Sequence, residues 1–134
     1  EAVLRSTDLL SLHLPLTPAT RRLIDRSALA QMQPHALLIN TARGELIDQE
    51  ALIEALEEGH LGGFAADVLA AEPPPANSPL LQLPNVLITP HSASLTARTY
   101  NEMCVTTVNN ALALLNGQPV EDRFIFNRSL LDNQ

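Results

Sequence analysis

The sequence predicts an α/β fold built around a parallel β-sheet. Short apolar runs of strand length alternate with segments that carry helix start and stop signals, and a polar residue follows each run. This alternation is typical of parallel strands joined by right-handed crossovers. With 134 residues, 46% of them hydrophobic, the chain is long enough to form one domain with its own core.

Four strands and three complete helices are expected, and residues 1–6 resemble the end of a helix that is already under way. The predicted strands are residues 9–12, 36–39, 62–66 and 86–88. The predicted helices are residues 26–32, 49–58 and 97–116. Each helix follows a residue whose side chain can accept a hydrogen bond from the first helical turn: Asp25, Asp48 and Thr96. Two glycines, Gly59 and Gly117, stand just past helix ends.

The remaining segments have less regular predicted roles. Gly62 and Gly63, with the alanines that follow, suit the close approach of a helix. Three consecutive prolines, 73–75, predict a stiff extended connector, which three leucines are expected to pack onto the body: Leu80, Leu81 and Leu83. Residues 127–134 resemble a loose tail, so we predict a domain over residues 1–117 and a C-terminal tail over 118–134.

The stretch around Arg43 organises the predicted fold. Residues 36–39 are uniformly apolar, which predicts a strand buried on both faces of a parallel sheet. Gly44 is expected to allow a turn at a backbone angle that other residues resist, so that Arg43 projects from the carboxyl end of the strand. Ligands of open α/β sheets bind outside these ends. We therefore expect Arg43 to face a ligand, most simply an anion.

Bulk properties exclude several functional classes. A formal charge of -7 and a pI near 4.9 argue against nucleic acid or an anionic membrane as the partner, and no apolar run has the ~20 residues that span a bilayer. The single cysteine, Cys104, excludes an internal disulfide, and a cytoplasmic location is predicted. The four histidines and Cys104 lack close metal-ligand spacing, so no metal site is expected. The five glycines form neither Gly-x-Gly-x-x-Gly nor a P-loop.

Three ionisable side chains, Arg43, Glu72 and His91, follow the ends of three separate predicted strands. Because the carboxyl ends of parallel strands share one edge, the three can converge. Singly, each has an ordinary explanation: a solvated surface charge, a loop carboxylate, or a histidine that bonds its own loop. Together they could bind an organic acid and exchange a proton with it. Asp67 could accept hydrogen bonds from a ligand, or cap the end of its strand.

Four sequence blocks, in this order, resemble the carboxyl-terminal part of the D-isomer-specific 2-hydroxyacid dehydrogenases. They are residues 8–18 (DLLSLHLPLTP), 38–44 (LINTARG), Ala66-Asp67-Val68 with Glu72-Pro73, and Asn85-Val86 with Thr89-Pro90-His91. The resemblance covers residues 7–116. It implies the later half of a Rossmann-type domain that binds NAD or NADP.

The resemblance also implies roles for individual residues. Arg43 would bind the carboxylate of a 2-oxo acid, His91 would be the general acid or base, and Glu72 would be its partner. Asp67 would contact the nicotinamide end of the cofactor. The dinucleotide would be lined by Leu14, Thr41, Ala42, Arg43, His91, Ser92, Ala93 and Ser94. Relatives often have Ile or Leu and then Gly after the histidine, where this chain has Ser92-Ala93.

Several alternatives remain open at this level. A phosphite- or formate-type dehydrogenase fits the same pattern, although Glu72 disfavours formate, and a dinucleotide-sensing corepressor or a nonfunctional fragment are further possibilities. The glycine fingerprint and substrate domain of the family are absent from this sequence. We therefore expect the isolated chain to bind dinucleotide weakly and not to turn over. The substrate would be a small 2-oxo or 2-hydroxy acid, glyoxylate or hydroxypyruvate being plausible, and relatives suggest a homodimer.

Overall fold

The computed structural model describes residues 2–125, which fall into two compact units divided between Ala93 and Ser94. The first unit contains the whole β-sheet, and the second contains one long helix. The predicted boundary at residue 117 does not coincide with this division and stays a prediction. The predicted tail over 127–134 lies outside the described residues.

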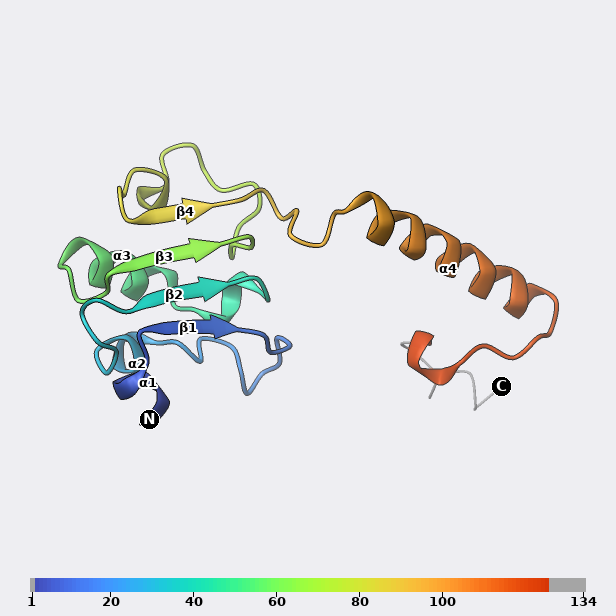
Figure 1. Cartoon of the computed structure of the whole chain (residues 1–134), viewed down its shortest axis with the longest axis horizontal. Helices are drawn as coiled ribbons and strands as arrows, with labels where there is room; N and C mark the ends of the chain where they lie inside the picture. Colours follow the sequence, from blue (N-terminus) through green and yellow to red (C-terminus); the bar gives the residue numbers. More distant parts are fainter. Residues whose placement is uncertain (1, 126–134) are drawn as a thin grey trace. The chain divides into compact units, whose positions relative to one another are not determined.

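The first unit is built on a four-stranded parallel sheet, which confirms the predicted α/β fold (Figure 1). The strands are β1 (Leu9–Leu12), β2 (Leu37–Asn40), β3 (Gly63–Ala66) and β4 (Val86–Ile88), and they neighbour one another in sequence order. The predicted strands differ from these by at most one residue at each end. The register aligns Leu10, Leu38, Phe64 and Val86 across the sheet. All four carboxyl ends consequently lie along one edge.

The helices of this unit are α1 (Ala2–Ser6), α2 (Arg26–Leu29) and α3 (Gln49–Glu57). Asp25 accepts a hydrogen bond from the Ala28 amide and Asp48 from the Ala51 amide, which confirms both predicted N-caps. The helix predicted to reach Met32 ends at Leu29, although Met32 is still buried. Between β3 and β4 the described chain has no α-helix but a single 3₁₀ turn at Pro79–Leu81, in a segment where prolines remove backbone donors.

One face of the sheet is buried and the other is partly open. The buried face joins α2 and α3 in one apolar core, which includes Leu38, Leu52 and Phe64. On the opposite face Leu37 is 45% exposed and Leu87 is 66% exposed. The prediction that the second strand is buried on both faces is therefore wrong for this unit, because its two covering helices share one side.

The structure corrects two predictions, the helix contact of Gly62 and the packing of Leu81. A Cβ on Gly62 would lie 2.6 Å from the His35 carbonyl oxygen, so this glycine accommodates the backbone that leads into β2 and not a helix. Of the connector leucines, Leu80 is buried and Leu83 packs against the core, but Leu81 is 44% exposed. Gly59, at φ +71°, follows the end of α3 as predicted.

The second unit contains α4 (Ala97–Leu115) and a 3₁₀ turn at Asp122–Phe124. Thr96 accepts a hydrogen bond from the Thr99 amide, and Gly117, at φ +66°, follows the helix end, as predicted. The apolar residues along α4 are exposed in the structure, among them Tyr100, Met103, Val108 and Leu112. Across the described part of the chain, no helix has both the length and the apolar character needed to cross a bilayer.

We predict that Leu38→Ala lowers the free energy of unfolding by about 2–5 kcal/mol, because it leaves a cavity in the core under the sheet. Leu87→Ala, on the open face, should cost less than about 1 kcal/mol. Urea unfolding followed by the NMR signals of the sheet residues measures both. Equal losses for the two variants would contradict the assignment of buried and open faces.

Candidate active site

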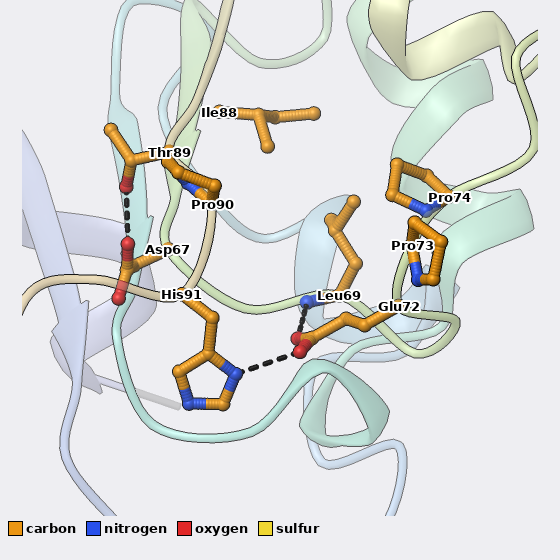
Figure 2. Close-up of a pocket in the computed structure, with 9 residues that line it drawn as sticks. All are labelled: Asp67, Leu69, Glu72, Pro73, Pro74, Ile88, Thr89, Pro90 and His91. Atoms are coloured by element: carbon orange, nitrogen blue, oxygen red, sulfur yellow. Dashed lines mark hydrogen bonds and ion pairs between the residues drawn. The ribbon is translucent and has the colours of Figure 1, made fainter.

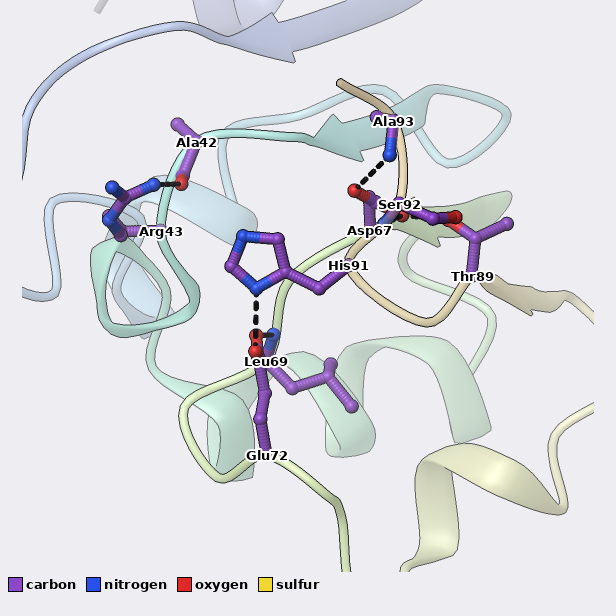
Figure 3. Close-up of polar contacts among 9 residues, drawn as sticks. All are labelled: Ala42, Arg43, Asp67, Leu69, Glu72, Thr89, His91, Ser92 and Ala93. Atoms are coloured by element: carbon purple, nitrogen blue, oxygen red, sulfur yellow. Dashed lines mark hydrogen bonds and ion pairs between the residues drawn. The ribbon is translucent and has the colours of Figure 1, made fainter. Parts of the chain in front are cut away.

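Loops from the carboxyl ends of β2, β3 and β4 bring together the residues predicted to do chemistry (Figures 2 and 3). Arg43 follows β2, Asp67 and Glu72 follow β3, and His91 follows β4. All four belong to the first compact unit. The parallel register places these loops beside one another although they are separated by as many as 48 positions (43 to 91) in the sequence.

Glu72 and His91 form the closest pair in the site. His91 Nδ1 lies 2.7 Å from Glu72 Oε2, and Glu72 Oε1 accepts a hydrogen bond from the Leu69 amide at 2.7 Å. The hydrogen bond from His91, followed by that from the Leu69 amide, lowers the pKa of the Glu72 carboxyl below its ordinary value. Because an ionised carboxylate only accepts, the proton shared with it belongs to Nδ1. Nε2 is then the ring atom that can exchange a proton with a ligand.

Asp67 organises the chain that carries His91. Its carboxylate accepts the Thr89 hydroxyl and the amides of Ser92 and Ala93. These hydrogen bonds, that from Thr89 first, lower the pKa of Asp67. Three of roughly four lone-pair positions are thus occupied, which leaves one acceptor position on Oδ2.

Arg43 keeps most of its hydrogen-bonding capacity. Its Nη1 donates to the Ala42 carbonyl at 2.6 Å, and within residues 2–125 the guanidinium makes no other hydrogen bond or ion pair, so most of its five donors remain open. In Figure 3 His91 Nε2 points away from Glu72, toward the side on which Ala42 and Arg43 lie. A guanidinium in this state can bind a carboxylate through two parallel hydrogen bonds.

Sequence analysis missed Asn40 as a residue that shapes the Arg43 loop. Asn40 is fully buried at the end of β2, where its side-chain amide donates to the Arg43 carbonyl at 2.9 Å and its oxygen accepts from the Ala42 amide at 3.0 Å. The sequence does contain a signal for this role, because Asn40 directly follows three apolar residues of a predicted strand. A side-chain amide buried at the end of a strand needs hydrogen-bond partners, and the loop that follows is the nearest source of them.

Gly44 has a different role from the predicted one. Gly44 does not adopt a positive φ, and it is the first residue of a 3₁₀ helix, Gly44–Leu46. A Cβ at this position would lie 2.0 Å from the Leu69 carbonyl carbon and 2.2 Å from the Ala70 nitrogen. Glycine is required because the Arg43 loop and the Glu72 loop touch backbone to backbone. The same Leu69 residue donates its amide to Glu72, so this contact links the two loops of the site.

Two cavities open at this edge. One, of about 490 Å³, lies at the ends of β1 and β2 and is lined by His13, Leu14, Pro15, Leu16, Thr41, Ala42 and Arg43. The other, of about 380 Å³, is lined by Asp67, Leu69, Glu72, Pro73, Pro74, Ile88, Thr89, Pro90 and His91 (Figure 2). The first contains every residue predicted to line the dinucleotide from the first two loops, and its size suits part of such a ligand.

His13 lines the first cavity but was considered only as a possible metal ligand in the sequence. Its Nε2 lies 2.8 Å from the Ser11 hydroxyl. Among residues 2–125, no three His, Cys, Asp or Glu side chains are grouped so as to hold a metal ion. Ser94 belongs to the second compact unit, and its predicted contact with cofactor stays a prediction.

A parallel α/β sheet with ligand-sized cavities and polar loops at its carboxyl edge defines the class of α/β domain that binds its ligand at the strand ends. Comparison with known proteins identifies the family: the model of the NAD-binding domain of the D-isomer specific 2-hydroxyacid dehydrogenases matches residues 1–93. The chain belongs to this family. The domain that matches is the NAD-binding domain of that family.

Individual relatives agree with this assignment. Glyoxylate/hydroxypyruvate reductase B of Pectobacterium carotovorum is 44% identical over 122 residues, 91% of this chain and 38% of that protein. The D-lactate dehydrogenase of Lactobacillus jensenii, solved with NAD+, has a TM-score of 0.80 and 38% identity over 88% of this chain and 39% of its own. A 2-hydroxyacid dehydrogenase of Xanthobacter autotrophicus, solved with NADPH and MES, has a TM-score of 0.74 and 40% identity over 89% of this chain and 48% of its own. The chain thus spans less than half the length of each relative.

We predict that Gly44→Ala lowers the free energy of unfolding by about 1–3 kcal/mol, because the new methyl group must displace the Leu69–Ala70 backbone. The same displacement should break the hydrogen bond from the Leu69 amide to Glu72 and speed hydrogen exchange at that amide. Gly59→Ala is the control, since its Cβ meets no atom within 4 Å and only its positive φ is unfavourable. Gly59→Ala should leave hydrogen exchange at the Leu69 amide unchanged. If Gly44→Ala also left this exchange rate unchanged, the backbone contact would be refuted.

The lowered pKa values of Asp67 and Glu72 predict how stability depends on pH. A carboxyl whose pKa is lower in the folded state stabilises the fold above its unfolded pKa, and this contribution is lost as pH falls through the folded pKa. We therefore expect the free energy of unfolding to be level near neutral pH and to fall below about pH 4. Asp67→Asn and Glu72→Gln should each flatten the fall, which urea titrations from pH 7 to pH 2.5 measure. An unchanged slope in both variants would be inconsistent with these interactions.

Proposed function

We propose that the protein to which this chain belongs is an NAD(P)-dependent oxidoreductase that interconverts a D-2-hydroxy acid and its 2-oxo acid, with glyoxylate or hydroxypyruvate as the substrate type. The observation that carries the proposal is the hydrogen-bonded Glu72–His91 pair at the same sheet edge as the open guanidinium of Arg43. The family assignment and the 44%-identical glyoxylate/hydroxypyruvate reductase support it.

Arg43 binds the substrate carboxylate in this proposal. Its unused donors form paired, charge-assisted hydrogen bonds with the two carboxylate oxygens, and its positive charge polarises the adjacent carbonyl group. Binding by two parallel bonds also fixes the orientation of the acid relative to the imidazole. A lysine at this position would supply charge without the paired geometry.

His91 exchanges the proton. In the direction of reduction, protonated Nε2 donates to the carbonyl oxygen of the 2-oxo acid as it becomes a hydroxyl, and in oxidation neutral Nε2 removes that proton. Glu72 accepts from Nδ1 in both states, so it orients the ring and stabilises its cationic form. The half-exposed side chains of the pair, at 53% for His91 and 36% for Glu72, leave the ring accessible to substrate.

Bound NAD(P) would supply or accept the hydride at its nicotinamide ring. Residues Leu14, Thr41, Ala42 and Arg43, with residues 91–94, would hold the dinucleotide, and the open acceptor position of Asp67 would receive a hydrogen bond from its nicotinamide end. Glu72 favours a 2-oxo acid over formate, because formate-type relatives tend to have glutamine there.

The proposal also covers the cellular location, oligomeric state and partners of the protein. We expect a cytoplasmic homodimer whose partners are small acids and not nucleic acid or membrane. The net charge of -7 disfavours polyanionic partners, and the exposed apolar residues of α4, such as Tyr100 and Met103, offer surface for association.

Activity measurements on the longer protein test the assignment. His91→Gln and Glu72→Gln should lower kcat/KM for glyoxylate by about 10²–10⁴-fold, because proton transfer is lost or misoriented. Arg43→Gln should lower it at least as much, mainly through a raised KM. The rate of NADH or NADPH oxidation is the measurement.

Matched controls exist in the same chain. His60 and Glu58 form an exposed pair, with His60 Nδ1 3.2 Å from Glu58 Oε2, and Arg21 is an exposed arginine outside the site. His60→Gln and Arg21→Gln should retain full activity. Absence of NADH or NADPH oxidation by the unmodified protein with any small 2-oxo acid would reject the enzyme and favour a dinucleotide-sensing role.

A further inference from the structure

The chain after β4 folds around the carboxylate of Asp67. The Thr89 hydroxyl donates to Oδ1 at 2.5 Å, the Ser92 amide to the same oxygen at 2.9 Å, and the Ala93 amide to Oδ2 at 2.8 Å. Asp67 is only 6% exposed, so water competes poorly for these positions. The carboxylate is therefore the centre of the turn formed by residues 89–93 (Figure 3).

His91 has a backbone conformation that requires this support. Its φ of +53° lies in the left-handed region, which is unfavourable for a residue with a side chain. The His91 amide donates to the Thr89 carbonyl at 3.0 Å, and the next two amides are those that Asp67 accepts. In this conformation the imidazole reaches Glu72 with a 2.7 Å contact. A relaxed turn would move the ring away from that partner.

Thr89 joins the turn to the sheet. Its amide donates to the Ala66 carbonyl at 2.9 Å, which continues the pairing of β3 with β4. Its hydroxyl is the one side-chain donor to Asp67 within the described residues, since the other two donors are amides of the turn itself. Thr89 is also stiff at χ1 because it is β-branched. The hydroxyl is therefore placed by the sheet, independently of the turn that it helps to form.

We propose that Thr89 is a positioning residue for His91. Its hydroxyl orients the Asp67 carboxylate, the carboxylate holds the amides of Ser92 and Ala93, and the folded turn holds the imidazole against Glu72. The importance of this positioning for catalysis rests on the proposed acid–base function of His91. The effect of Thr89 on the position of the imidazole does not depend on that function. Thr89 acts through Asp67 and His91 and does not itself touch the reacting acid.

The test compares Thr89→Val, which keeps the side-chain shape and removes the hydroxyl, with Thr89→Ser, which retains the hydroxyl. The readout is the pKa of the Glu72 carboxyl in the 134-residue chain, followed by ¹³C NMR. His91 lowers this pKa, so displacement of the imidazole should raise it, by about 0.5 or more in Thr89→Val. Hydrogen exchange at the Ser92 and Ala93 amides should accelerate about tenfold or more. In Thr89→Ser both readouts should stay close to those of the unmodified chain.

Thr107→Val is the matched control, because the Thr107 hydroxyl bonds the Met103 carbonyl at 2.8 Å on exposed α4. It should leave both readouts unchanged. If Thr89→Val does not fold, Thr89→Ala provides the same loss of hydroxyl and must give the same rise. An unaltered Glu72 pKa with unaltered amide exchange, or changes in Thr89→Ser as large as those in Thr89→Val, overturns the proposal.

Kinetics on the longer protein separate this inference from the proposed function. Thr89→Val should lower kcat about 10–100-fold with little change in KM, because substrate binding by Arg43 is retained while the proton donor is misplaced. If Glu72 responds as expected but the unmodified protein does not oxidise NADH or NADPH, the positioning role stands and the proposed function fails. If the unmodified protein is active and Thr89→Val has normal kcat, the positioning role is wrong and the proposed function stands.

Discussion

Two ionised carboxylates hold the candidate site together. Asp67 gathers the turn that carries His91, and Glu72 binds both the imidazole and the Leu69 amide. Carboxylates suit this task because each oxygen accepts more than one hydrogen bond and charge strengthens each bond. Loops that would otherwise have few regular hydrogen bonds thereby gain a defined conformation. The candidate proton donor and its partner are consequently positioned before any ligand binds.

Close packing of backbones is the second constraint on the site. Gly44 lets the loop after β2 touch the loop after β3, and Asn40 ties the first of these loops to the end of its strand. The guanidinium of Arg43 and the Glu72–His91 pair are thus supported by one connected set of backbone contacts. Such connection explains how groups from three strands can act on a single small molecule.

Membership of the dehydrogenase family and the geometry of the site answer different questions. A parallel α/β sheet hosts many chemistries, so the fold alone specifies a ligand-binding edge. The particular residues at that edge are the basis for the proposal of proton exchange beside an anion-binding guanidinium. The chain spans 38% of its reductase relative, and the proposed substrate type therefore belongs to the whole protein rather than to this domain by itself.

The sequence by itself determined the strands, the three side-chain helix caps and the placement of Arg43, Asp67, Glu72 and His91 at strand ends. These features depend on the periodicity of apolar residues and on hydrogen bonds between residues close in sequence. Both can be predicted from the order of residues along the chain. Only the tertiary structure decided that Gly44 serves a backbone contact, that one face of the sheet is open, and that Asp67 binds the turn after β4. The Gly44 contact and the Asp67 turn join residues 22 to 26 positions apart, and the open face depends on which side of the sheet the helices cover. Such proximity arises from packing in space and leaves no periodic signal in the sequence.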